Sequence, residues 1–433
     1  MNGANGGNAG AATRDRAGRP IVAVTGIGVV TSLGIGKSDN WAKLTAGVSG
    51  IRRISRFPSD NLKTTIAGTV DQVYEDYMTP ARLSERIAVL AAEEAVGQSG
   101  IGGKGHFPGP LCLAEPPLEI EWPSRFKMAE MAATNAEALY PDLMRVAREY
   151  GKGFETFHFG IVGDQLAEHF GTEGSPISLN TACASGAAAI QLGVEAIRRG
   201  ECTAVLAIGA EGSVTPESLV RFSLLSALST QNDPPEQASK PFSKNRDGFV
   251  IAEGAAALVL EDLAQARSRG ARVLGIIEGC GEKSDSFHRT RSSPDGKPII
   301  ACMRSALADA AVEPDDIDYI NAHGTSTPEN DKMEHLGVSA VFGERAASIP
   351  ISSNKSMIGH TLTAAGAVEA AFTLLTLEHQ RIPPTINYKV PDPAIPLDVV
   401  PNVAREARVN RAISNSFGFG GQNVCLVMTR EPA

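Results

Sequence analysis

Cys183 lies at the start of a predicted helix, a position that favours a nucleophilic cysteine. Small and polar residues lead into it, and apolar residues from Ala187 to Ile197 recur at three- and four-residue spacing. This pattern predicts an amphipathic helix that ends at Gly200. The unpaired N–H groups of a helix N-terminus favour a thiolate, so we expect a cysteine pKa below the free value of about 8.5. A buried structural cysteine among small residues is the alternative interpretation.

Two histidines and a lysine follow predicted strands in the second half of the chain. His323 comes directly after a predicted strand at 318–322, and Lys355 follows another at 352–354, with His360 five residues further on. The carboxyl ends of strands gather at one place in an α/β sheet, so these side chains and the cysteine could converge. Each histidine taken alone could equally be a structural residue.

Two glycine-rich segments suggest different roles. Residues 415–423, NSFGFGGQN, are too rich in glycine for a strand and predict a turn whose backbone N–H groups could face an oxyanion. Residues 21–25 predict a strand that turns at Gly26–Gly28. A dinucleotide site is not favoured there, because Thr31 takes the place of the third glycine of that motif.

The elements that must position these residues follow an α/β pattern. We expect helices at 40–46, 83–98, 262–269 and 361–379, with another starting at Pro328, and strands at 203–209, 272–279 and within 241–260. A fresh α/β run starts near residue 270, which places a boundary between two halves there. Residues 104–150 follow no clear pattern.

The composition bounds the class of protein. The chain has 433 residues, 42% hydrophobic, with 44 glycines and 5% aromatics, which suits a tightly layered α/β protein. Its net charge of -9 argues against nucleic-acid binding. The six cysteines lack CxxC spacing and predict no metal site and no disulfides, so we expect a cytoplasmic protein. No apolar run suits membrane insertion, and residues 1–18 are expected to be a disordered tail.

Seven motifs, in consistent order between Arg19 and Thr429, resemble those of the β-ketoacyl-acyl-carrier-protein synthases, the elongating condensing enzymes of fatty-acid synthesis. They are VTGIGVVTSLG, TACASG, PFSKNRDGFVIAEG, NAHGTSTPEND, SNKSMIGHTLTAAGAVEA, RIPPTIN and NSFGFGGQN. The resemblance implies a thiolase-like fold of two similar α/β halves, here 19–270 and 271–433, in α/β/α/β/α layers, and a homodimer. It implies decarboxylative condensation of malonyl-acyl carrier protein with a cysteine-bound acyl chain. No cofactor is implied, because the pantetheine arm belongs to the acyl carrier protein.

The resemblance also assigns roles to residues of this chain. Cys183 matches the nucleophile, His323 and His360 match the histidines of malonyl decarboxylation, and Lys355 matches the lysine that holds them. The other matched positions are the oxyanion-hole amides of Cys183 and Phe419, the gate Phe419, the substrate-binding residues Thr325, Thr327, Phe417 and Gly420, and the structural supports Asp331, Glu334 and Glu369.

The chain departs from the family pattern at three places. LCLAEPPLEIEW at 111–122 replaces a glycine-rich segment that normally shapes the acyl pocket. Gln231 and Gln422 replace a usual arginine and threonine. These departures suggest specialisation for unusual or very long acyl chains.

The same residues leave two alternative functions to consider and predict one docking surface. A thiolase would need a second catalytic cysteine, for which Cys425 is poorly placed. A non-catalytic, chain-length-setting partner subunit typically lacks the nucleophilic cysteine. The acidic carrier protein requires a basic docking patch, for which the candidates are Arg52, Arg53, Arg56, Lys63, Arg82 and Arg86.

Overall fold

One strand order occurs twice in the fold. The structure is a computed structural model that describes residues 12–76, 78–103, 105–117, 122–132, 139–149 and 158–430. The first group of strands lies in the order β1 (Val22–Thr31), β8 (Gly254–Asp262), β7 (Ala204–Glu211), β5 (Leu111–Ala114) and β6 (Ile177–Leu179). The second group lies in the order β9 (Gly275–Ser284), β15 (Gln422–Thr429), β14 (Arg411–Phe417), β10 (Tyr319–Asn321) and β11 (Ile351–Ser352).

Both groups have the same strand directions. In the first group, β1 is antiparallel to β8, β8 is antiparallel to β7, and β7, β5 and β6 are parallel. In the second group, β9, β15, β14, β10 and β11 repeat these directions in the same order. β1 also pairs with β9 over Val22–Val24, which joins the groups into one continuous sheet. The fold is therefore an internal duplication.

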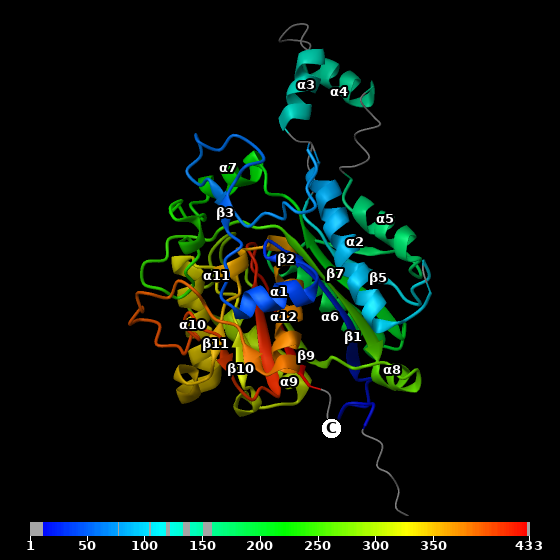
Figure 1. Ribbon diagram of the computed structural model, residues 1–433. Helices are drawn as coiled ribbons and strands as arrows, with labels where there is room; N and C mark the ends of the chain where they lie inside the picture. Colours follow the sequence, from blue (N-terminus) through cyan, green and yellow to red (C-terminus); the bar gives the residue numbers. More distant parts are fainter. Residues whose placement is uncertain are drawn as a thin grey trace, which may run out of the picture.

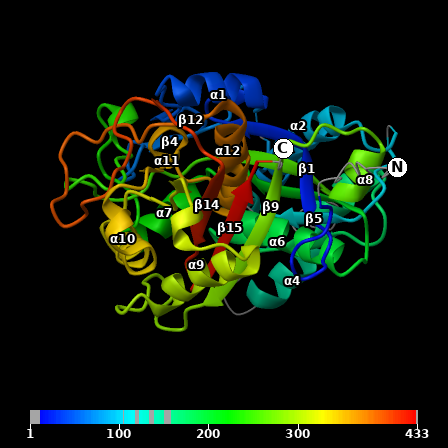
Figure 2. The ribbon, with the colours of Figure 1, turned by 90° about the horizontal axis from the view of Figure 1, so that it is seen from below.

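Helices complete five layers (Figures 1 and 2). The outer layer on the first group contains α2 (Pro80–Ser99) and α5 (Ile161–Phe170), the central layer contains α6 (Ser185–Arg198) and α12 (Ala365–His379), and the outer layer on the second group contains α9 (Lys297–Ala310) and α10 (Pro328–Phe342). One cluster of buried apolar side chains fills both faces of the central layer, and a separate cluster lies beneath each outer layer. This is the predicted thiolase-like arrangement.

The two central helices cross in backbone contact. A Cβ atom on Gly186 of α6 would lie 2.5 Å from the backbone nitrogen of Ala367, and one on Gly366 would lie 2.5 Å from that of Ala187. The absence of side chains at both positions lets the helices approach this closely. The crossing brings together the segments that precede the two helices, and these segments carry Cys183 and His360.

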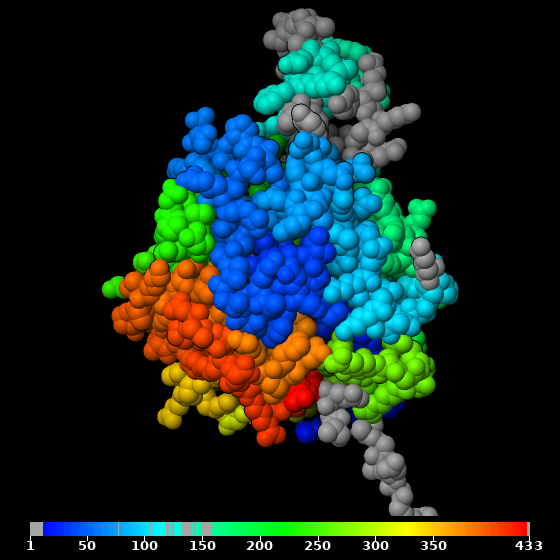
Figure 3. Space-filling view, in the orientation of Figure 1, coloured from blue at the N-terminus to red at the C-terminus, as the bar shows by residue number. Residues whose placement is uncertain are grey.

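The remaining elements surround this core. The helices are α1 (Lys37–Thr45), α3 (Trp122–Ala132), α4 (Leu139–Glu149), α7 (Pro216–Leu224), α8 (Leu263–Ser268) and α11 (Lys355–Ile358), and the short strands are β2 (Gly34–Ile35), β3 (Arg52–Arg53), β4 (Ile66–Ala67), β12 (Arg381–Ile382) and β13 (Arg405–Glu406). Single 3-10 turns are η2 (Pro235–Gln237), η3 (Pro314–Asp316), η4 (Gly343–Ala347) and η5 (Leu362–Ala364). The hairpin of α3 and α4 projects from the body (Figures 1 and 3).

Several predicted boundaries need correction. β1 does not turn at Gly26–Gly28 but continues through these residues to Thr31. A Cβ on Gly28 would lie 1.8 Å from the carbonyl oxygen of Ala91. The glycine therefore allows α2 to pack closely on β1 and does not serve a nucleotide site. In NSFGFGGQN the turn is only residues 418–421, because the flanking residues pair as β14 and β15. The long strand expected within 241–260 forms only as β8.

Other predictions hold or stay open. Helices form close to the expected positions as α1, α2, α8, α10 and α12. Residues 1–11 of the expected tail lie outside the described residues, whereas 12–18 form a turn in which Asp15 accepts hydrogen bonds from Arg19. The boundary near residue 270 stays a prediction. None of the described helices is both long and apolar enough to cross a membrane.

Candidate active site

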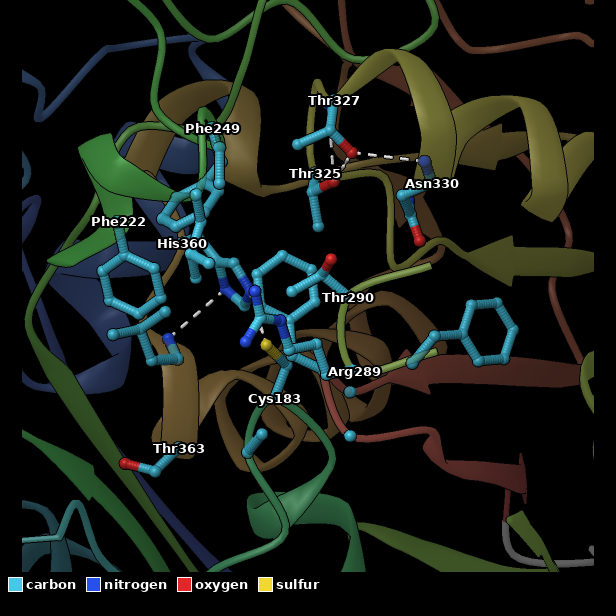
Figure 4. A pocket seen from close by; sticks show the side chains of 18 of the residues that line it. Cys183, Phe222, Phe249, Arg289, Thr290, Thr325, Thr327, Asn330, His360 and Thr363 are labelled. Carbon is cyan, nitrogen blue, oxygen red and sulfur yellow. Dashed lines mark hydrogen bonds between the residues drawn. The ribbon is translucent and has the colours of Figure 1, made fainter. Parts of the chain in front are cut away.

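A cavity of about 630 Å³ opens where the two halves meet. Cys183, His323 and His360 line it, and one donor atom from each of the three lies within 4.8 Å of the others. Figure 4 shows Phe222 and Phe249 on one side of the cavity and Arg289 and Thr290 on the opposite side. The predicted convergence of the cysteine and histidines is thus present in the structure.

The loop that carries Cys183 is held by local hydrogen bonds. Ser185 Oγ accepts from the N–H of Thr181 at 2.8 Å and donates to the carbonyl of Ala182 at 2.6 Å. Asn180 Oδ1 accepts from the N–H of Ala182 at 3.1 Å. Ala182 has φ 51°, a conformation that a residue with a side chain rarely adopts. These bonds hold the strained turn that presents the sulfur just before α6.

Burial, not the helix terminus, determines the direction in which the pKa of the Cys183 thiol shifts. The side chain of Cys183 is 7% exposed, and desolvation raises its pKa to about 11, opposed by the amide of Phe419 and the charge of Lys355. The expectation of a lowered pKa is therefore wrong for the free protein. At neutral pH the resting nucleophile is a thiol.

The hydrogen bonds of His360 define its tautomer. Its Nδ1 accepts from the N–H of Leu362 at 3.3 Å, so the proton of a neutral ring lies on Nε2. Nε2 lies 3.1 Å from Sγ of Cys183. The backbone N–H of the histidine donates to the carbonyl of Val250 at 2.7 Å, and the ring of Phe249 packs edge-on at 5.2 Å between centroids. His360 therefore presents an N–H donor toward the sulfur.

Different partners hold His323 in the same tautomer as His360. Lys355 Nζ donates to its carbonyl at 2.7 Å and lies 3.4 Å from its Nδ1. An ammonium beside Nδ1 leaves the ring proton on Nε2. The two imidazole rings stand nearly perpendicular, with centroids 5.4 Å apart. Burial, reinforced by the nearby lysine charge, lowers the pKa of both histidines well below the ordinary value, so both are neutral at pH 7.

Three acidic residues lie behind these groups. Glu334 accepts from the N–H groups of His323 at 2.8 Å and Gly324 at 2.7 Å, and burial raises its pKa to about 7. Glu369 pairs with Lys355, and Asp331 accepts from the N–H of Phe242 at 2.8 Å. All three contact protein groups that hold the loops, which fits the predicted supporting role.

The 418–421 turn brings a second backbone amide to the sulfur. The backbone N–H groups of Phe419 and Cys183 lie beside Sγ and favour its anion, since both lower the thiol pKa against the effect of burial. Gly421 has φ 87°, and a Cβ there would lie 1.8 Å from the carbonyl oxygen of Asp285, so only glycine fits. The ring of Phe417 packs edge-on against His323 at 5.8 Å. The geometry agrees with the expected oxyanion hole.

The threonines expected to contact substrate line the same cavity (Figure 4). Thr325 Oγ1 and Thr327 Oγ1 are 2.9 Å apart, and the Thr327 hydroxyl also caps α10 by accepting from the N–H of Asn330 at 3.2 Å. Gly420 lines the cavity and donates its N–H to the carbonyl of Arg289 at 2.8 Å.

Sequence reasoning missed several cavity residues. Glu211 ends β7, is buried, and accepts from the Thr363 hydroxyl at 2.9 Å; burial raises its pKa to about 6. Its position at the carboxyl end of a strand was the available signal. Phe222 and Phe249 carried no local signal, because their role depends on packing between distant segments.

Arg56 must be removed from the predicted docking patch, whereas the patch itself stays a prediction. Arg56 is 6% exposed and pairs with Glu253 at 2.6 Å and Asp71 at 2.9 Å. Arg53 pairs with Asp233 at 2.6 Å, and Arg86 pairs with Glu75. Each of these arginines is paired with a carboxylate that no local sequence pattern identifies as its partner. Arg56 in particular is a structural residue, not a free surface cation.

Comparison with known proteins now identifies the family. The description "Beta-ketoacyl synthase, N-terminal domain" matches residues 20–101 and 134–266, and "Beta-ketoacyl synthase, C-terminal domain" matches 274–389. The chain belongs to the β-ketoacyl synthase family. Residues 102–133, which include β5 and α3, fall outside the family match, in the region where the sequence departs from the motif pattern.

Two named relatives and one solved structure match nearly the whole length of this chain. A 3-oxoacyl-[acyl-carrier-protein] synthase 2 from Coxiella burnetii is 37% identical over 94% of this chain and 98% of that protein. The tetracenomycin polyketide synthase ketoacyl synthase alpha subunit from Streptomyces glaucescens is 36% identical over 94% and 97%. A solved type II polyketide ketosynthase, in complex with its acyl carrier protein, superposes with TM-score 0.85 at 32% identity, covering 95% of this chain and all of that one.

Proposed function

We propose that this ketoacyl synthase is a 3-oxoacyl-[acyl-carrier-protein] synthase that extends a Cys183-bound acyl chain by decarboxylative condensation with malonyl-acyl carrier protein. One observation carries the assignment: a buried thiol, two neutral imidazoles that present N–H donors, and two backbone amides converge in one cavity. These groups supply a nucleophile, donors to an enolate and an oxyanion hole.

The first step is acyl transfer to Cys183. Sγ forms a bond to the acyl carbon, the bond from that carbon to the pantetheine sulfur breaks, and the thiol proton passes to the departing sulfur. The tetrahedral oxyanion accepts from the N–H groups of Cys183 and Phe419. Because this thiol and the leaving thiol are both weak acids, the exchange needs no strong base.

The second step is decarboxylation of the malonyl group. The bond to the carboxylate carbon breaks and carbon dioxide leaves, and the electron pair passes to the thioester oxygen as an enolate. That oxygen accepts from Nε2–H of His323 and His360. Neutral imidazoles suit this role, since each keeps its donor proton throughout. Lys355 positions His323 through its carbonyl and Nδ1.

The third step forms the new carbon–carbon bond. The enolate carbon attacks the Cys183 thioester, and the oxyanion forms at the same two amides. Collapse of this intermediate expels the cysteine sulfur as a thiolate, which takes a proton from solvent, and the 3-oxoacyl chain remains on the carrier protein. We propose that no metal or cofactor takes part, although thiolate–imidazole sets of this kind can also bind zinc.

Two sets of residues in the cavity lining suit different parts of the substrate. Phe222, Leu225 and the prolines at 116 and 117 are apolar, and we assign them to the acyl chain. The threonines at 325 and 327 are polar, and we assign them to the pantetheine arm. The segment after Pro117 lies outside the family match, and this supports an unusual or very long acyl substrate.

We further propose a cytoplasmic homodimer that acts on acyl carrier protein. The sheet has two ends. At one, the N–H of Ile351 in β11 donates to the carbonyl of Asp398 at 2.9 Å, so neighbouring chain covers this edge. At the other, β6 ends the row with Ile177 46% exposed. An open edge with an exposed apolar residue favours pairing with a second copy.

A non-catalytic, chain-length-setting subunit is the second candidate. A solved ketosynthase/chain length factor structure, 34% identical to this chain with TM-score 0.81, supports this candidate. The complete set of Cys183, His323 and His360 argues against it, because such a subunit needs no nucleophile.

Intact-mass measurement after incubation with a panel of acyl-acyl carrier proteins distinguishes the two. The synthase should gain the mass of the preferred acyl group, and peptide mapping should place it on Cys183. A protein that gains no acyl mass from any chain length would be the non-catalytic subunit.

A further inference from the structure

Four cationic side chains line the catalytic cavity: Arg221 of α7, and three others from the loop before α9 and from α10. Arg289, Arg291 and Lys332, here called the cationic lip, line the cavity and are exposed. Within the part of the chain that the structure describes, no carboxylate lies within ion-pair distance of any of them. This differs from the arginines on β3 and α2, which are paired with acids.

Four carboxylates line the cavity, and two of them, Asp285 and Glu329, lie on the same segments as the lip. Asp285 is buried, and its oxygens accept from the backbone N–H groups of Phe287 at 2.9 Å and Ser293 at 2.7 Å, so it serves the loop. Glu329 lies in the first turn of α10 beside Lys332. The lip therefore keeps an excess of positive charge on a chain whose net charge is -9. Such a local excess suits an anionic ligand.

The loop that carries the two arginines is attached to the oxyanion turn. The N–H of Asp285 donates to the carbonyl of Gly421 at 2.7 Å, and the N–H of Gly420 donates to the carbonyl of Arg289 at 2.8 Å. Gly421 packs against the backbone of Asp285 with no space for a side chain. A ligand held by the arginines is thus one hydrogen bond away from the turn that positions the amide of Phe419.

We propose that the cationic lip binds the phosphodiester that joins the pantetheine arm to its carrier, and that this contact helps to seat the Phe419 amide. The inference rests on the proposed function and names the residues that recognise its substrate. The arginines line the cavity itself, which suits a group on the arm better than the outer surface of a carrier protein. Guanidinium groups match phosphate oxygens in bidentate geometry.

The test compares thioesters that differ only in the phosphate. We expect wild type to prefer an acyl phosphopantetheine over an acyl pantetheine as substrate, measured as the ratio of the two kcat/KM values. In the double variant Arg289→Gln/Arg291→Gln this ratio should fall about tenfold, since two charge-assisted contacts are lost. Arg408→Gln removes an exposed arginine that does not line the cavity, and it should keep the wild-type ratio.

A second readout does not require turnover. Phosphopantetheine should protect Cys183 from alkylation at lower concentration than pantetheine does, and the double variant should lose this difference. An unchanged ratio and unchanged protection would overturn the proposal, whatever happens to total activity. A loss seen only with intact carrier protein would also overturn it, because the arginines would then contact the protein and not the phosphate. Absence of any acylation in wild type, with the protection difference intact, would instead refute the proposed function.

Discussion

At the scale of single residues, the site keeps its groups neutral until substrate arrives. Burial raises the pKa of the Cys183 thiol and lowers the pKa of both histidines, so the free site at pH 7 holds a thiol and two neutral imidazoles. A neutral imidazole can stabilise the enolate by hydrogen bonding without giving up its proton. The orientation of Nε2–H toward the sulfur shows that His360 is arranged as a donor and not as a base.

The raised thiol pKa predicts the pH dependence of alkylation. Only the thiolate reacts with iodoacetamide, and with a pKa of about 11 its fraction grows about tenfold per pH unit between about 7 and 10. The second-order rate at Cys183 should therefore keep rising across this range, as peptide mapping of each time point would show. A plateau at or below about pH 8.5 would mean that the helix terminus outweighs burial. Cys183→Ala provides the background rate.

At the scale of elements, the crossing of α6 and α12 sets the distance between nucleophile and histidine. Each helix follows a loop that carries one of the two groups, and the helices touch through backbone at Gly186 and Gly366. A change in their separation moves Cys183 relative to His360. The small residues after the cysteine thus serve the chemistry by letting the central layer close.

Gly186→Ala should damage both stability and activity. Its Cβ would meet the backbone nitrogen of Ala367 at 2.5 Å, and overpacking of this kind costs about 1–3 kcal/mol of unfolding free energy. The matched control is Gly97→Ala in α2, where the added Cβ meets nothing within 4 Å and better helix propensity stabilises by about 0.5–1 kcal/mol. Denaturant unfolding and kcat would be measured for both. Equal stability of the two variants would contradict the role of the crossing.

Local signals account for what the sequence predicted at this scale. The helix after Cys183, the strand before His323 and the Pro328 helix start follow from periodicity, strand-end position and the proline, all readable within a few residues. Long-range contacts account for the failures. Arg56 is neutralised by Glu253, 197 residues away, and the thiol pKa depends on burial by both halves. The hairpin of α3 and α4 lies where the motif pattern fails.

At the scale of the whole molecule, the duplicated halves divide the work. The first half supplies the nucleophile, and the second supplies both histidines, the lysine and the oxyanion turn. Cys183 follows β6 and His360 follows β11, which are equivalent strands in the two groups. In the homodimer proposed above, the β6 end of the continuous sheet would be the edge that pairs with a second copy.

If the proposed homodimer pairs through β6, Ile177→Asp should convert it to a monomer. The substitution places a charge on the open edge of β6, and an inward or edge charge opposes strand pairing. Val403, which is 73% exposed outside this edge, gives the matched control Val403→Asp. Sedimentation velocity would report a monomer for the first variant and a dimer for the second. A dimer in both would mean that the interface lies elsewhere.

The division of labour between thiol and imidazoles is tested most directly by carbon dioxide release from malonyl-acyl carrier protein. Cys183→Gln, which mimics an acylated site and keeps both histidines, should retain or raise decarboxylation while it abolishes condensation. His360→Ala should lose decarboxylation yet still gain acyl mass on Cys183. Equal loss of carbon dioxide release in both variants would contradict the account, because the cysteine would then be needed for the step assigned to the histidines alone.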